Sequence, residues 1–124
     1  SYKLQMIHLT DRTVLERFRD KLLAREDLKD RIQAFFSNDQ YLEILPARAN
    51  KGTAIQFVTD YLNVSPEHTF GAGDAENDIP MLDAAHVGVA MQNASDAVKM
   101  HADIITEKNN DEDGLLEVIE KYFQ

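Results

Sequence analysis

The 124-residue sequence contains no cysteine, which excludes both a disulfide scaffold and a metal site built from thiolates. It also lacks any apolar run near the roughly 18 residues that a membrane-spanning helix requires, and no signal-peptide pattern opens it. Basic residues are scarce, with 13 Lys and Arg against 22 Asp and Glu and a formal net charge of −9, whereas nucleic-acid binding needs clustered basic residues. We therefore expect a cytoplasmic protein with no nucleic-acid partner and no membrane partner.

The rest of the composition is ordinary for a globular domain. Hydrophobic residues make up 44% of the chain and charged residues 28%, as in typical folded proteins, and a chain of this length can bury a modest core. The net negative charge of the chain disfavours binding of an anionic substrate. A phosphate would need a metal ion and a well-placed lysine nearby to offset that charge.

One stretch is rich in residues that can carry chemistry: residues 69–82 have the sequence TFGAGDAENDIPML. Glycine adopts backbone conformations that other residues avoid, so we expect Gly71 and Gly73 to permit a sharp turn at a strand end. Asp74 and Asp78 would then lie on a tight loop at the carboxyl end of a parallel strand, where open α/β sheets bind ligands. Magnesium is usually held by one or two carboxylates together with a substrate phosphate. A simple capped turn is the structural alternative.

The same stretch predicts the start of the next helix. Asn77 or Asp78 can accept hydrogen bonds from the first N–H groups of that helix, and Pro80 is tolerated in its first turn. Asp74 and Asp78 cannot lie unscreened beside each other, so we expect magnesium or Lys51 close to them. A solvated surface lysine is the alternative interpretation of Lys51, since a cation at a helix N-terminus opposes the macrodipole.

Hydrophobic spacing predicts an α+β part followed by an α/β part. The first part has the order strand, helix, strand, strand, over residues 2–9, 11–24, 31–36 and 41–45. Thr10-Asp11 offers an N-cap for the helix, and a turn is expected at 37–39. After a composition break at 46–50, a helix opens at Lys51 with Ile55, Val58 and Leu62 on one stripe. Strands at 69–71, 87–90 and 103–105 then alternate with helices at 77–85, 95–101 and 114–123. Such alternation predicts a parallel sheet covered by helices.

Residues 73–82 resemble the fourth motif of the haloacid dehalogenase-like (HAD) hydrolases, particularly of their Cof-type sugar-phosphatase branch. The similarity continues through Ala84-Ala85, Gly88-Val89-Ala90-Met91, Asn93-Ala94, Ala102-Asp103, Thr106, Asn109 and Asp113-Gly114. Upstream, residues 42–46 and 50–54 resemble the third-motif region of that branch. The resemblance implies an α/β fold: half of a HAD-type, Rossmann-like parallel sheet with flanking helices, preceded by an α+β remnant of the cap domain. Residues 1–45 would be the C-terminal part of the cap and residues 46–124 the C-terminal half of the core.

The resemblance also implies a role for each site residue. Lys51 matches the lysine that contacts phosphate and the nucleophilic carboxylate, and Asn77 matches a substrate-phosphate contact. Asp74 matches the metal-binding aspartate. Asp78 matches an acid that supports both the lysine and the water shell of the metal, which makes it a catalytic and a metal-site residue. Asn109 is expected near the mouth of the site.

The implied activity is magnesium-dependent hydrolysis of small phosphate monoesters, sugar- or nucleotide-like, through an aspartyl-phosphate. The family nucleophile lies in an Asp-x-Asp-Gly-Thr motif that follows an apolar strand. Residues 111–115, DEDGL, imitate it but follow the polar run EKNN, so we reject them as a nucleophile loop. We therefore expect a fragment that is inactive by itself and lacks the strand carrying the nucleophile.

Three alternatives and one consequence follow. The chain could be a non-catalytic module that binds phosphate and metal, or a half that complements a separate N-terminal half. Gly-Asp-x-x-Asn-Asp and Gly-Val-Ala-Met also resemble the phosphorylation domain of P-type ion pumps.

Without the nucleophile strand, the strand that leads to Asp74 would be a bare sheet edge, a template for pairing with another chain. We therefore expect self-association through that edge.

Overall fold

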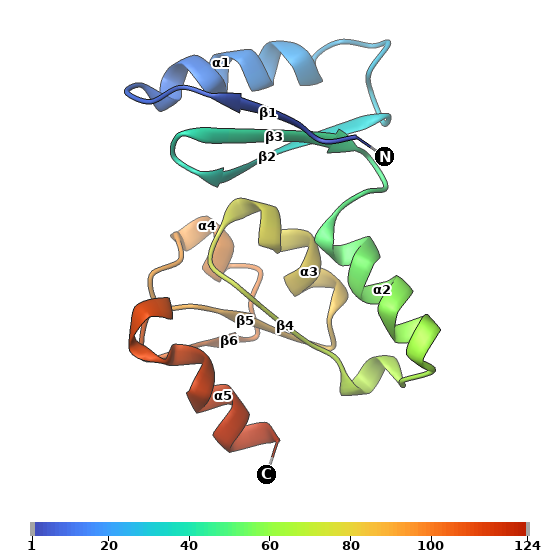
Figure 1. Ribbon diagram of the computed structural model, residues 1–124, viewed down its shortest axis with the longest axis vertical. Coiled ribbons are helices and arrows are strands. Elements are labelled where there is room, and N and C mark those ends of the chain that lie inside the picture. Colours follow the sequence, from blue (N-terminus) through green and yellow to red (C-terminus); the bar gives the residue numbers. More distant parts are fainter. Residues whose placement is uncertain (1, 124) are drawn as a thin grey trace. The chain divides into compact units, whose positions relative to one another are not determined.

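The structure is a computed structural model that describes residues 2–123 (Figure 1). The chain divides into two compact units, one up to Asn50 and one from Lys51 onward. Within the described residues, none of the helices combines the length and apolar character that crossing a membrane would require.

The first unit is a three-stranded antiparallel sheet with one helix. Its elements are β1 (Leu4–Ile7), α1 (Arg12–Leu23), β2 (Ile32–Asn38) and β3 (Tyr41–Pro46), and β3 lies between β1 and β2 in the sheet. The register pairs Ala34 with Ile44 and Phe36 with Leu42, and these four side chains form the core together with Leu15 of α1. The predicted order of strand, helix, strand, strand is confirmed.

Two local predictions in this unit have different outcomes. Asp11 caps α1 as expected, because its side chain accepts a hydrogen bond from the backbone N–H of Thr13 at 2.9 Å. The turn predicted at 37–39 is displaced to Asp39 and Gln40, since β2 continues to Asn38 across a register irregularity after Phe36. Asn38 instead accepts a hydrogen bond from the backbone N–H of Gln40, which places the turn one step later.

The second unit is a three-stranded parallel sheet with helices around it. Its strands are β4 (Phe70–Gly73), β5 (Val87–Ala90) and β6 (Ile104–Ile105), in that spatial order. Its helices are α2 (Lys51–Leu62), α3 (Ile79–Ala84), α4 (Asp96–Lys99) and α5 (Gly114–Tyr122), with short 3₁₀ turns η1 (Pro66–His68), η2 (Glu76–Asp78) and η3 (Asn110–Glu112). The predicted α/β class with a parallel sheet is confirmed.

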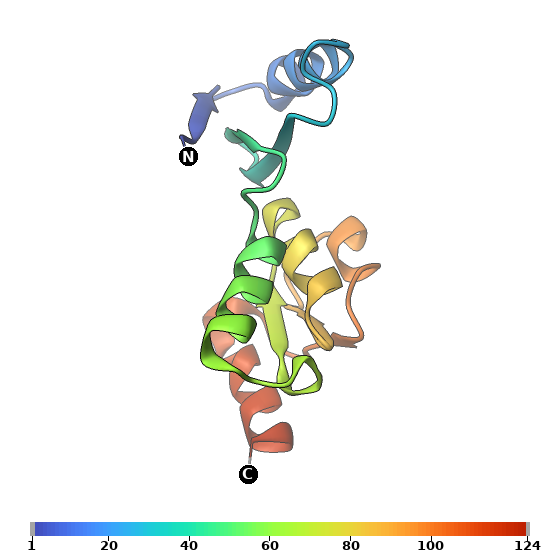
Figure 2. The same ribbon diagram turned by 90° about the vertical axis from the view of Figure 1, so that its right-hand side faces the viewer.

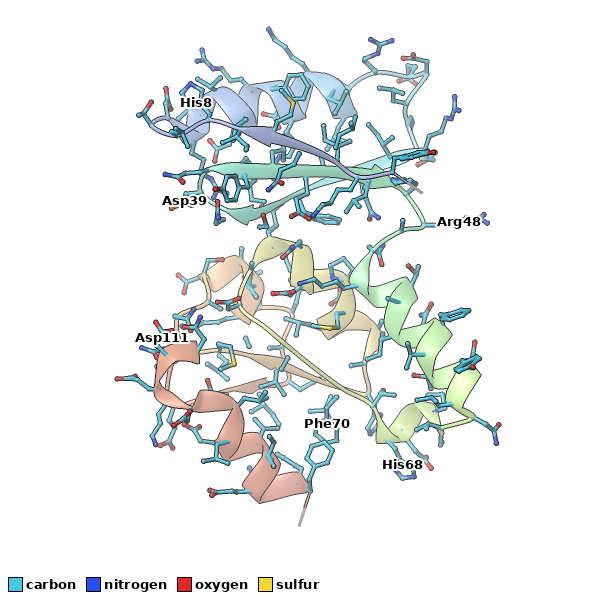
Figure 3. The ribbon with its side chains drawn as sticks, viewed as in Figure 1. His8, Asp39, Arg48, His68, Phe70 and Asp111 are labelled. Carbon is cyan, nitrogen blue, oxygen red and sulfur yellow. The ribbon has the colours of Figure 1, made fainter. Side chains whose placement is uncertain are left out.

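Consecutive residues of β4 show how helices cover both faces of this sheet, since neighbouring side chains on a strand point to opposite faces. The Phe70 ring packs on the rings of Tyr122 and Phe123, at the C-terminal end of α5 (Figure 3). On the other face, a Cβ added to Gly71 would lie 2.9 Å from the carbonyl oxygen of Met81 in α3. α2 lies beside α3 in both views (Figures 1 and 2).

Several sequence-based boundaries and one buried face need correction. The helix expected at 77–85 starts as the 3₁₀ turn η2 and becomes α-helical at Ile79, and the helix expected at 95–101 is shortened to α4. The stripe expected to be buried on α2 is largely exposed: Val58 and Leu62 retain 49% and 60% of their accessible surface. Gly52 and Thr59, two small residues, are the buried residues of α2 instead.

Candidate active site

The loop after β4 is organised by the Asp78 carboxylate, which is almost fully buried. Its Oδ2 accepts hydrogen bonds from the backbone N–H groups of Asp74 and Ala75, each at 3.0 Å. The Asp78 side chain thus points toward the preceding loop residues, and no side-chain hydrogen bond caps α3. The expectation that Asp78 or Asn77 caps this helix is therefore wrong, because the loop amides hold the carboxylate.

Gly73 is needed for packing and not for a turn. None of the described glycines has a positive φ, so the expectation of a sharp glycine turn is wrong. A Cβ at Gly73 would lie 2.6 Å from Oδ2 of Asp78 and closer still to other atoms of that side chain. The absent side chain leaves the space that the Asp78 carboxylate occupies.

Lys51, the first residue of α2, brings a cation to this carboxylate. Its Nζ donates to Oδ1 of Asp78 in an ion pair whose lysine side chain is half exposed. Lys51 is therefore not a free surface lysine, and the Asp78 charge offsets the unfavourable position of an ammonium at a helix N-terminus.

Asp74 is held by amides from two other loops. Its Oδ2 accepts from Asn93 Nδ2 at 2.9 Å and from Asn110 Nδ2 at 3.4 Å. Asn93 follows β5, and Asn110 opens η3 after β6. No described residue donates to Asp74 Oδ1. The carboxyl ends of three parallel strands therefore meet at Asp74.

The remaining predicted residues lie around this loop. Asn77 sits in η2, half-buried, and its side chain forms no hydrogen bond with any other described residue. Asn109 does not turn toward Asp74, because its side chain accepts from the backbone N–H of Asp111 and caps η3. Asp111 itself lies on the turn that leads into α5 (Figure 3). Residues 111–115 therefore run from the 3₁₀ turn η3 into α5 and do not directly follow a strand, which agrees with their rejection as a nucleophile loop.

The carboxylate oxygens that accept no hydrogen bond decide which of these residues could coordinate a metal ion. In the described part of the chain, no three His, Cys, Asp or Glu side chains gather as a metal site. Both oxygens of Asp78 already accept hydrogen bonds from Lys51 and the loop amides. Asp74 keeps one oxygen without a donor, and a single carboxylate with waters and a substrate phosphate is a common magnesium arrangement. Asp74 therefore fits as a direct ligand.

Sequence reasoning assigned no role to Asn93, Asn110 or Thr106. Asn93 belonged to the resembling stretch, yet only the fold brings its amide to Asp74. One signal was present: Asn93 and Thr106 each follow an apolar strand closely, and the carboxyl ends of parallel strands share one edge of the sheet.

Comparison with known proteins decides the family. The family model for haloacid dehalogenase-like hydrolases matches residues 2–119. The chain belongs to this family. Within the HAD hydrolases it is of the Cof type: a HAD/COF-like hydrolase from Plasmodium vivax is 26% identical with a TM-score of 0.81, and the chain aligns over 98% of its own length and 41% of that structure.

Two curated relatives show how much of a longer protein the chain matches. It is 40% identical over 82 residues to the 5-amino-6-(5-phospho-D-ribitylamino)uracil phosphatase YitU of Bacillus subtilis, covering 66% of this chain and 30% of YitU. It is 38% identical over 93 residues to the chloroplastic endoribonuclease YBEY of Arabidopsis thaliana, covering 75% of this chain and 16% of that protein. The chain thus spans less than half the length of these relatives.

Proposed function

We propose that this chain carries the metal- and phosphate-handling part of a magnesium-dependent HAD phosphatase. The substrates would be small phosphate monoesters, sugar- or nucleotide-like, hydrolysed through an aspartyl-phosphate whose nucleophile lies outside these 124 residues. The observation that carries the proposal is the convergence of Lys51, Asp78 and Asp74 at one loop after β4. The match to a phosphatase of a phosphorylated metabolite in Bacillus supports the substrate class.

Each site residue has a separate task in this proposal. The Lys51 ammonium neutralises the substrate phosphate and orients the nucleophilic carboxylate beside it. Asp78 positions that ammonium and, through its hydrogen bonds to the loop amides, fixes the backbone of Asp74. Asn77, whose amide is not engaged by the described residues, donates to the phosphate.

Asp74 and Asp78 form the proposed metal site. Asp74 would be the direct ligand, because one of its oxygens carries no hydrogen bond from the described residues, and Asp78 would support the water shell of the metal. When bound, magnesium supplies charge neutralisation and Lewis-acid polarisation of the phosphoryl oxygens.

We further propose that the first unit is the end of a cap and that the second is the C-terminal half of the core. The first unit has its own core around Phe36 and Leu42, so it can pack independently of the catalytic loop. In this arrangement the first unit contributes to substrate choice and the second to the chemistry.

A complementation assay tests the proposal. The 124-residue chain should hydrolyse a chromogenic phosphate ester at no measurable rate when alone. Mixing it with the part of YitU outside the matched segment should give magnesium-dependent turnover that Lys51→Met abolishes. Turnover by the chain alone at ordinary enzyme rates would contradict the proposal.

A second candidate is a non-catalytic module or a complementing half. The observation that favours it is the coverage of only 30% of YitU. Binding of magnesium and inorganic phosphate to the chain, with no hydrolysis in any mixture, would identify the module. Turnover only in the mixture would identify the complementing half.

We also propose that the chain self-associates through β4, which has a neighbour on one side only in the described sheet. Thr69 and Gly73 accept hydrogen bonds from residues at the two ends of β5, so by alternation the backbone groups of Phe70 and Ala72 point away from β5. Sedimentation should show concentration-dependent association that is weakened by Ala72→Pro, which removes an outward N–H. A monomer at every concentration would refute the idea.

A further inference from the structure

The Asp74 carboxylate is bound asymmetrically. Amides from two different loops donate to Oδ2, at 2.9 Å from Asn93 and 3.4 Å from Asn110, while no described residue donates to Oδ1. Hydrogen bonds to a carboxylate are charge-assisted and stronger than those between neutral groups. This pattern would hold the carboxylate plane in one orientation.

The carbonyl oxygen of the Asn93 side-chain amide also has a hydrogen-bond partner. Its Oδ1 accepts from the backbone N–H of Asn110 at 2.9 Å. A backbone N–H can only donate, so the carbonyl end of the Asn93 amide must face Asn110 and the NH₂ end must face Asp74. The hydrogen bond from the backbone N–H of Asn110 therefore fixes which end of this amide faces Asp74.

The two loops that supply these amides are fastened together by Thr106, which is buried. The Thr106 hydroxyl accepts from the backbone N–H of Gln92 at 3.0 Å and donates to the carbonyl of Lys108 at 2.6 Å. Gln92 precedes Asn93, and Lys108 lies two positions before Asn110. The loop after β5 and the loop after β6 are thus joined through the hydroxyl of one buried side chain.

The backbone of Asp74 is held from the opposite direction. Its N–H donates to Asp78 Oδ2 at 3.0 Å, and Asp78 is anchored in turn by Lys51. Both the main chain and one carboxylate oxygen of Asp74 are therefore restrained, by different parts of the sheet edge.

We propose that Asn93 is a positioning residue for the metal ligand Asp74, with Asn110 as a weaker second support. The Asn93 amide occupies Oδ2 and so commits Oδ1 to the divalent cation in a preset orientation. The part concerning the cation rests on the proposed function, whereas the restraint of Asp74 does not. Outer-shell partners of metal ligands act in this way, and their loss typically costs about 10- to 100-fold in metal affinity.

The first test needs no metal. In NMR spectra of the metal-free chain, the Hα–Hβ couplings of Asp74 should report one χ1 rotamer. Asn93→Ala should average them, while Gln92→Ala should leave them unchanged, since the neighbouring Gln92 residue is exposed and its side chain forms no hydrogen bond with Asp74. Averaged couplings in the unmodified chain, or unchanged couplings in Asn93→Ala, would overturn the proposal. Asn93 is exposed, so we expect all variants to fold, with circular dichroism as the check.

The second test uses Mn²⁺ alone, titrated against each variant and followed by paramagnetic broadening of Asp74 resonances. Asn93→Ala should weaken binding by about 10- to 100-fold. Asn110→Ala should weaken it by less, because its hydrogen bond is longer and its backbone N–H remains. Equal affinity of Asn93→Ala and the unmodified chain would overturn the proposal. If the unmodified chain binds no Mn²⁺, the proposed metal site fails, and the coupling measurement alone decides whether Asn93 restrains Asp74.

Discussion

Replacing Lys51 with methionine tests the ion pair on which the loop after β4 depends. The substitution keeps most of the side-chain volume but leaves the Asp78 carboxylate, whose side chain is only 7% exposed, without a countercharge. Two backbone N–H groups continue to donate to its Oδ2, so the carboxylate keeps part of its stabilisation.

The expected decrease in the free energy of unfolding lies between two limits. Breaking a fully buried pair by removing one partner costs about 3–5 kcal/mol, whereas an exposed pair contributes about 0–1 kcal/mol. The Lys51 side chain is 49% exposed, so solvent screens part of the interaction. We therefore expect Lys51→Met to lower the free energy of unfolding of the second unit by about 1–3 kcal/mol.

Residue-specific amide exchange is the suitable assay, because the chain has two units that need not unfold together. The amides of Val89 and Ala90, two fully buried residues of β5, report on the second unit. Lys108→Met is the matched control, since it removes the same charge from an exposed side chain. In a double-mutant cycle with Asp78→Asn, the effect of Lys51→Met should shrink. Equal exchange in Lys51→Met and Lys108→Met would refute the reasoning.

Three further predictions concern other parts of the two units. Gly73→Ala should displace the Asp78 side chain, with which the new Cβ would clash, and lower the free energy of unfolding by about 1–3 kcal/mol, measured by urea titration. Thr106→Val should leave a loop N–H and a loop carbonyl unpaired, costing about 1–3 kcal/mol and accelerating exchange of the N–H that Thr106 bonds. The hydrogen bonds from the Thr13 hydroxyl and backbone N–H hold the pKa of Asp11 below its ordinary value of 3.8; this stabilisation of α1 is complete above that value and is lost as the pH falls through the lower pKa of the folded state. Asp11→Asn keeps an acceptor but cannot titrate, so acid titration of α1 helicity should lose this component.

The parts of the structure that could be predicted from the sequence are those controlled by local pattern. The strand at 87–90 is predicted with its observed limits, because four apolar or small residues between turns leave few alternatives. Asp11 could also be predicted as a cap, because an aspartate directly before a helical pattern is a typical N-cap. The buried face of α2 could not be predicted, since Val58 and Leu62 have the spacing of a core stripe but the small residues Gly52 and Thr59 are the ones that are buried.

The candidate site also contains features that the sequence predicted and features that it could not predict. Lys51 and Asp78 are brought together by the fold, as the resemblance implied for an acid that supports the lysine, but the direction of the Asp78 side chain toward the loop amides could not be predicted. That direction depends on Gly73, whose missing Cβ creates the space. The amides of Asn93 and Asn110 could not be assigned either, because their hydrogen bonds connect loops that only the sheet brings together.

Asn110 lies 36 positions beyond Asp74 in the chain, and this separation has a consequence for biosynthesis. During translation Asp74 leaves the ribosome well before Asn93 and Asn110, whose amides bind its carboxylate. Contacts between distant positions also form slowly, because the loop-closure entropy must be overcome first. Assembly around Asp74 should therefore be among the last events of folding, and a nascent or truncated chain would expose a charged, loosely held loop to proteases and stray cations.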